Sequence, residues 1–182
     1  MKNKLFLTFI LLTPILVITA SSLYFYFGYK PDTTKNNGVF FNQYFSFENI
    51  KISNDASQLS FDDGKWVLAV YITEKTKADK SLYLMRQLNV ALNRDIYRVK
   101  RLAFYSDVNL ESDLNTIRDD YPRVDIFRDE SGVLLNVLQK NSRIDLNETN
   151  PIFLIDPYGR AVMYFDQELD PKLILKDLKV LI

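Results

Sequence analysis

Hydrophobic residues are distributed unevenly along the chain, and the longest apolar run lies near the N-terminus. The segment Leu5–Phe27, LFLTFILLTPILVITASSLYFYF, contains no charged residue. A membrane-spanning helix needs about 20 apolar residues, so this run is long enough to cross a bilayer. Its end is marked by tyrosines, whose rings are typical of the membrane–water interface: Tyr24, Tyr26 and Tyr29. We therefore predict a transmembrane anchor over residues 1–29.

A cleaved signal peptide is the alternative interpretation of this run, with a hydrophobic region that ends near Ile18 and a cleavage zone at TASS. The anchor is favoured because apolar residues resume after Ser22. Lys2 and Lys4 make the N-terminal flank positive, which predicts a cytoplasmic N-terminus and a C-terminal domain across the membrane. In a Gram-negative bacterium, we expect a single-pass inner-membrane protein whose domain is periplasmic. No cysteine follows the run, so a lipoprotein anchor is excluded.

The remainder of the chain has the pattern of one globular domain behind a short linker. Residues 30–38 are polar, contain Pro, Asn and Gly, and show no apolar periodicity, so we interpret them as a linker. Residues 39–182 have a length suited to one domain with a real core. Residues 39–52 alternate loosely and predict one or two short strands, and residues 53–63 a polar loop.

A strand and a helix are the first strong predictions inside this domain. Lys65–Thr73, KWVLAVYIT, is a near-continuous apolar run, typical of a strand covered on both faces. Ala78–Asn93 predicts an amphipathic helix, because its apolar residues are spaced by three and four: Leu82, Met85, Leu88 and Leu92. The sequence TEKTKADK, residues 73–80, is then the connection between them.

Further elements follow in alternation. The pattern predicts a second core strand at Val99–Tyr105, a polar helix at Leu110–Tyr121 that Pro122 ends, a short strand at Val124–Phe127, a short helix at Gly132–Leu138 and a polar loop at Gln139–Asn150.

The last segment predicts a hairpin and a closing helix. Ile152–Ile155 and Ala161–Phe165 are antiparallel strands joined by the turn Asp156–Gly159, which has Asp, Pro and Gly where a type I turn favours them. Asp170 caps a helix with Pro171 at its first position. The predicted buried stripe of this helix is Leu173, Ile174, Leu178 and Leu181. The order of elements is that of an α/β, thioredoxin-like fold: a central mixed sheet with flanking helices, preceded by one transmembrane helix.

Composition narrows the possible chemistry. The chain has no cysteine and no histidine, which removes thiol nucleophiles, disulfide exchange, thiolate or imidazole metal ligands and histidine acid–base catalysis. Its 23 basic and 23 acidic residues balance, so no basic surface for nucleic acid is expected. The five glycines form no phosphate-binding loop.

Three blocks resemble the SCO/SenC-like membrane-anchored proteins that are associated with cytochrome c oxidase assembly. They are GKW at residues 64–66, LYLMRQLNVALNRDIYRVKR at residues 82–101, and IFLIDPYGRAVMYFDQELDPKLILKDLKVLI at residues 152–182. The resemblance implies a thioredoxin-like domain on a membrane anchor, with oxidase subunits or assembly factors as protein partners.

The same resemblance implies a copper site that this sequence lacks. In that family a CxxxC pair before the first long helix and a histidine before the hairpin bind copper. The matching positions are Glu74, Ala78 and, less closely, Glu148, so all three ligands are missing. We therefore expect a non-catalytic accessory protein that acts by protein–protein interaction, with no catalytic, cofactor-binding or metal-binding residues and no cofactor.

A metal-binding chaperone or an enzyme that uses methionines and carboxylates is the alternative. Met85 and Met163 are soft ligands suited to Cu(I), but each lies in an apolar pattern that favours core packing. Glu74, Asp79 and Glu148 can hold a hard cation only if folding brings them together.

Two other features leave alternatives open. Pro151 lies where thioredoxin-like domains often have a cis proline that faces the redox turn. An aromatic run forms either an exposed partner surface or a buried strand: Phe40, Phe41, Tyr44, Phe45 and Phe47.

Overall fold

The computed structural model describes residues 2–27, 35–47, 50, 52 and 58–182. Contacts divide the chain into two units, residues 1–35 and 36–182. The predicted boundaries at 29/30 and 38/39 stay predictions, because much of the linker lies outside the described residues.

The first unit is the helix α1, Lys2–Tyr26, which is long and apolar enough to cross a membrane. Its candidate span is Phe6–Tyr26, with a mean hydropathy of 2.2. Three threonine hydroxyls donate to carbonyl oxygens one turn earlier, as polar side chains in an apolar medium must: Thr8 to Lys4 O, Thr13 to Phe9 O and Thr19 to Ile15 O, at 2.8–2.9 Å. A signal sequence near an N-terminus has the same length and composition.

The second unit is built on one six-stranded mixed sheet with the order β1-β6-β5-β2-β3-β4. The strands β2, β3 and β4 are parallel, whereas β5, β6 and β1 are joined to them by antiparallel pairs. This arrangement confirms the predicted thioredoxin-like fold. The strands are β1 Val39–Phe40, β2 Trp66–Ile72, β3 Val99–Tyr105, β4 Val124–Arg128, β5 Ile152–Ile155 and β6 Ala161–Phe165.

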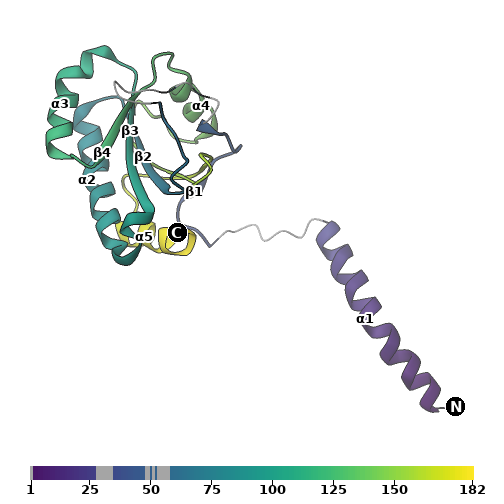
Figure 1. The fold of residues 1–182 in the computed structure, drawn as a ribbon. Coiled ribbons are helices and arrows are strands. Elements are labelled where there is room, and N and C mark those ends of the chain that lie inside the picture. Colours follow the sequence, from purple (N-terminus) through teal and green to yellow (C-terminus); the bar gives the residue numbers. More distant parts are fainter. Residues whose placement is uncertain (1, 28–34, 48–49, 51, 53–57) are drawn as a thin grey trace. The chain divides into compact units, whose positions relative to one another are not determined.

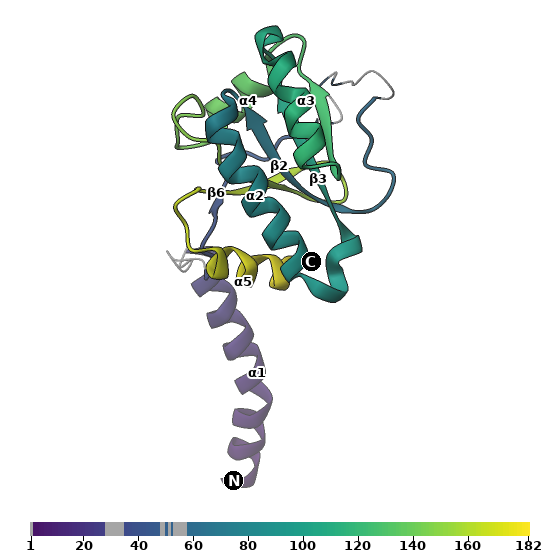
Figure 2. The same cartoon turned by 90° about the vertical axis from the view of Figure 1, so that its left-hand side faces the viewer.

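Helices cover both faces of the sheet (Figures 1 and 2). On one face, α2, α3 and α5 pack over the odd residues of β3, such as Val99 and Ala103. On the other, α4 and a set of apolar residues that precede β2 pack over Leu102 and Phe104: Phe41, Phe47, Ile52 and Phe61. The helices are α2 Lys75–Ala91, α3 Glu111–Asp120, α4 Val133–Asn141 and α5 Pro171–Leu181, with short 3₁₀ turns η2 at Asn93–Arg98 and η3 at Val108–Leu110.

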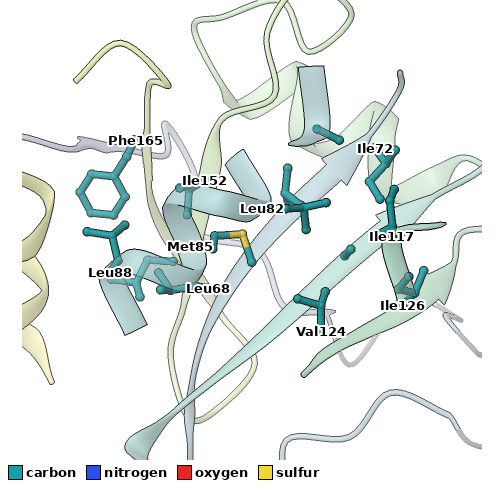
Figure 3. Packing of buried hydrophobic residues seen from close by; sticks show 14 of the residues in the cluster. Leu68, Ile72, Leu82, Met85, Leu88, Ile117, Val124, Ile126, Ile152 and Phe165 are labelled. Atoms are coloured by element: carbon teal, nitrogen blue, oxygen red, sulfur yellow. The ribbon is translucent and has the colours of Figure 1, made fainter. Parts of the chain in front are cut away.

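The core under α2 is continuous across the sheet. Leu82, Met85 and Leu88 point from α2 toward β2 and β5, and Ile117 of α3 reaches the same layer (Figure 3). Since each fully buried side chain of this size contributes about 1.5–3 kcal/mol, the apolar stripe is sufficient reason for α2 to dock on the sheet.

Three local predictions need correction. The helix α2 begins at Lys75 rather than Ala78, so most of the predicted connection at residues 73–80 is helical. The helix α4 continues to Asn141, into the predicted polar loop. In α5, Leu173 is exposed and Asp177 is buried instead.

Asp177 is buried because it binds the start of the domain. Its carboxylate accepts hydrogen bonds from Asn37 N (2.6 Å), Asn37 Nδ2 (2.7 Å) and Gly38 N (2.8 Å). A Cβ at Gly38 would overlap the ring of Phe165, so only glycine permits this approach. These contacts hold residues 37–38 against α5 beside the short strand β1.

Candidate functional site

Glu74 and Ala78, which match the CxxxC positions of the family that the sequence resembles, lie near the carboxyl end of β2. There the start of α2 faces the loop before β5. Asn150 is the last polar residue of that loop and is almost fully buried. Its Nδ2 donates to the carbonyl oxygen of Tyr71 near the end of β2. The loop is therefore fixed to the strand that leads into α2.

Ser81 and Gln167 complete a hydrogen-bonded network around Asn150. The hydroxyl of Ser81, in α2, donates to Asn150 O. Gln167 Nε2 donates to Ser81 Oγ (2.7 Å), Asn150 O (3.0 Å) and Lys77 O (3.0 Å). The network joins α2, the loop before β5 and the turn after β6 through neutral side chains. Ser81, Asn150 and Gln167 were not singled out from the sequence. The available signal was Ser81, a polar residue on the apolar stripe of α2.

Two further contacts hold the loop against the start of α2. Lys77 Nζ donates to Asn147 O (2.9 Å), and Thr73 Oγ1 donates to Leu146 O (3.4 Å). The chain thus keeps the juxtaposition of helix start and loop on which a thioredoxin-like site depends.

The positions that match the missing ligands have different environments. Glu74 is exposed, precedes the first turn of α2 and accepts a hydrogen bond from Thr76 Oγ1 (2.6 Å). This hydrogen bond, together with the ion pair to Lys77 (3.0 Å), lowers the pKa of the Glu74 carboxyl. Ala78 is fully buried, and Glu148 is exposed. A buried methyl group and two exposed carboxylates do not fit Cu(I), which prefers thiolates and thioethers.

Carboxylates do not gather into a hard-cation site either. Asp79 pairs with Lys75 at 2.8 Å, and Glu74 pairs with Lys77. In the part of the chain that the structure describes, no group of three or more Asp, Glu, His or Cys side chains is arranged to hold a metal. Folding therefore does not bring Glu74, Asp79 and Glu148 together as a metal site, which was the condition for the alternative.

The remaining sequence candidates are mostly structural. Met85 and Met163 are fully buried, as core packing requires. The peptide bond before Pro151 is trans. The aromatic run divides: Phe41 and Phe47 are buried in the second core, whereas Tyr44 is exposed. Phe45 contacts both buried rings, edge-on to Phe41 and tilted against Phe47.

A buried acid lies beside this site and was not predicted. Asp129 follows β4 and is fully buried; its Oδ2 accepts hydrogen bonds from Tyr71 Oη and Leu135 N, both at 3.2 Å. Burial raises the pKa of Tyr71 above its usual range, and the charge of Asp129 adds to the effect, although a hydrogen bond with Ser106 opposes it. The pair fixes α4 to the end of β2.

The comparisons with known proteins agree with this architecture. Residues 66–182 match the family described as transmembrane-like, thioredoxin-like, C-terminal domain. Since the match spans more than half of the chain, the chain belongs to this family. No curated protein sequence matches the chain.

Several solved structures share the fold at low sequence identity. Copper-bound Sco1 from yeast is 13% identical with a TM-score of 0.54, over 83% of this chain and 92% of that one. A SCO1/SenC family lipoprotein from Bacillus anthracis is 15% identical with a TM-score of 0.53, over 81% and 97%. Copper-bound ScoI from Bradyrhizobium japonicum is 17% identical with a TM-score of 0.50, over 73% and 97%. At these identities the likeness establishes the fold.

Proposed function

We propose that this protein is a non-catalytic, membrane-anchored accessory protein in the assembly of respiratory cytochrome c oxidase, and that it acts by binding other proteins. One of its structural neighbours is described as a member of the Sco family of cytochrome c oxidase assembly proteins, at 16% identity and a TM-score of 0.53. Two other neighbours, ScoI from Bradyrhizobium japonicum and Sco1 from yeast, have copper bound in their structures. The resemblance in sequence points in the same direction.

The observation that carries the non-catalytic part is the network of Ser81, Asn150 and Gln167. These groups donate to one another and to backbone carbonyls at the end of the sheet where thiol chemistry is expected. A serine hydroxyl without an adjacent histidine or other base is a weak nucleophile. The arrangement therefore supports a structural role for these side chains rather than a reactive centre.

The anchor extends this proposal to location. Lys2 and Lys4, which precede the apolar span of α1, favour a domain on the far side of the membrane, which is the periplasm of a Gram-negative bacterium. Oxidase subunits and assembly factors that expose domains to this compartment are then its partners.

Deletion of the gene, followed by haem difference spectra of isolated membranes and by oxygen uptake, tests the proposal. We expect less assembled oxidase in the deletion strain and full recovery with the wild-type chain. The double variant Glu74→Ala, Glu148→Ala should restore assembly equally, because neither exposed carboxylate has a chemical role in this account. Normal haem spectra in the deletion strain would overturn the role in oxidase assembly; a folded double variant that fails to restore them would overturn the non-catalytic mode.

A further inference from the structure

Arg101 is a buried cation on a mostly apolar face of the sheet. It belongs to β3, where it has the same orientation as Val99 and Ala103, and only 6% of its surface is exposed. Its Nη1 is buried and has no hydrogen-bond partner, and no ion pair joins Arg101 to any described carboxylate. A buried charge without a partner is strongly unfavourable, so an anion that provides acceptors would bind here with a large gain.

A hollow of about 250 Å³ lies beside Arg101. It is formed where the last turns of α2 face the end of α3 and the start of β4. Arg86 of α2 and Arg123 before β4 also line it, and both are exposed. A second hollow of about 300 Å³ shares Arg101 and Arg123 and adds Lys65 and Lys100. Both hollows beside Arg101 are therefore lined by further basic side chains.

Electrostatic repulsion between these side chains supports an anionic ligand. The pKa of Arg101 is lowered chiefly by burial, and then by the positive charges of Arg123 and Arg86. The one carboxylate that lines the first hollow is Asp120. Three guanidinium groups against one carboxylate leave a positive excess that folding alone does not explain.

We propose that Arg101, Arg86 and Arg123 form a binding site for a small phosphate-type anion. Guanidinium groups suit this ligand because their planar donors match phosphate oxygens in bidentate pairs. Asp120 favours a phosphate that still carries a proton, since its carboxylate can accept a hydrogen bond from a phosphate hydroxyl, which sulfate lacks at neutral pH. The hollow has room for one such group with a small substituent. This site is independent of the proposed role in oxidase assembly.

The neutral balance of the chain argues against a polymeric ligand. With 23 basic and 23 acidic residues, the chain has no net positive charge to attract the backbone of a nucleic acid. A single concave site with a buried cation is instead typical of recognition of one small group.

The test is a titration of the ¹⁵N-labelled full-length chain, held in maltoside micelles, with inorganic phosphate at constant ionic strength. We expect saturable shifts of the Arg101 Nε–Hε resonance and of the backbone amides of Asp120, Tyr121 and Arg123. Arg101→Met and Arg123→Gln should each weaken binding by roughly tenfold or more. Arg118→Gln is the matched control: it removes the same charge from α3 outside the hollow and should bind as the wild type does.

The second part of the test is the same titration with sulfate in place of phosphate. The wild type should bind phosphate more tightly than sulfate, and Asp120→Asn should reduce this preference. No saturation by about 20 mM phosphate, where a site of millimolar affinity would be nearly full, would overturn the proposal. Equal responses to phosphate and chloride, or an equal loss with Arg118→Gln, would also overturn it, because they indicate charge screening only.

Reconstitution into nanodiscs distinguishes the two possible sources of the phosphate group, a lipid headgroup and a soluble ligand. In phosphatidylcholine nanodiscs with and without phosphatidic acid, and without free phosphate, a shift of the Arg101 resonance that requires phosphatidic acid identifies a lipid headgroup. A shift that appears only when inorganic phosphate is added identifies a soluble ligand.

Discussion

The two ends of the parallel strands differ in how their polar side chains are used. At the carboxyl end of β2, Asn150 and Ser81 bind neighbouring backbone oxygens and hold loop, strand and helix together. Toward the amino end of β3, Arg101 is also buried, yet its Nη1 has no hydrogen-bond partner in the described residues and it lies beside a hollow. In a thioredoxin-like protein the carboxyl end is the expected place for chemistry. In this chain the polar side chains at the carboxyl end of β2 are structural, and the proposed anion site lies toward the amino end of β3.

Asn150→Ala should have the largest effect on stability. It removes the buried donor to Tyr71 O and leaves a small cavity, so we expect a loss of about 2–3 kcal/mol in the free energy of unfolding. Denaturant unfolding of the full-length chain in maltoside, followed by near-ultraviolet circular dichroism, measures it. Asn147→Ala is the matched control, because Asn147 is exposed and its side chain makes no described contact. Equal stabilities of the two variants would contradict a structural role for the carboxyl end.

Tyr71→Phe should have an intermediate and pH-dependent effect. Loss of the hydrogen bond to Asp129 is expected to lower stability by about 1–2 kcal/mol at pH 7. The pKa of Tyr71 is raised in the folded protein, so its contribution is complete below the unfolded value of about 10 and is lost as the pH rises above it. The wild type should therefore lose stability above pH 10 more steeply than Tyr71→Phe.

Arg101→Met should have the smallest effect, and in the opposite direction. Because a well-packed apolar side chain avoids the burial of an unpartnered charge, we expect a gain of about 1 kcal/mol in phosphate-free buffer. Phosphate at roughly ten times the wild-type dissociation constant should stabilise the wild type by about 1.4 kcal/mol and Arg101→Met by at most about 0.4 kcal/mol, since its binding is at least tenfold weaker. A loss of stability in phosphate-free buffer would show that Arg101 is structural.

The sheet and the helices could be predicted because their signals are local. The apolar run of β2, the limits of β3, and the Asp170–Pro171 start of α5 each follow from adjacent residues, and the structure reproduces them. The start of α2 was missed because Lys75 to Lys77 are polar and lie outside the apolar period, although they extend the helix without strain.

The network and the arginine site could not be derived in the same way, because their partners are distant in sequence. Asn150 and Tyr71 are 79 residues apart, and Asp177 binds residues about 140 positions earlier. Arg101 did give a signal: in the alternation of β3 it occupies a position with the orientation of Val99 and Ala103. A charged residue at a core position of a strand is informative even when no motif surrounds it.

Copper binding by the full-length chain tests the central claim most directly. Cu(I) and Cu(II) are titrated separately into the protein in maltoside, followed by dialysis and metal analysis. The double variant Glu74→Cys, Ala78→Cys is the positive control, because it restores a thiolate pair at the start of α2. We predict about one retained Cu(I) per chain for this variant and none for the wild type; one retained copper per wild-type chain, at micromolar affinity or tighter, would contradict the account.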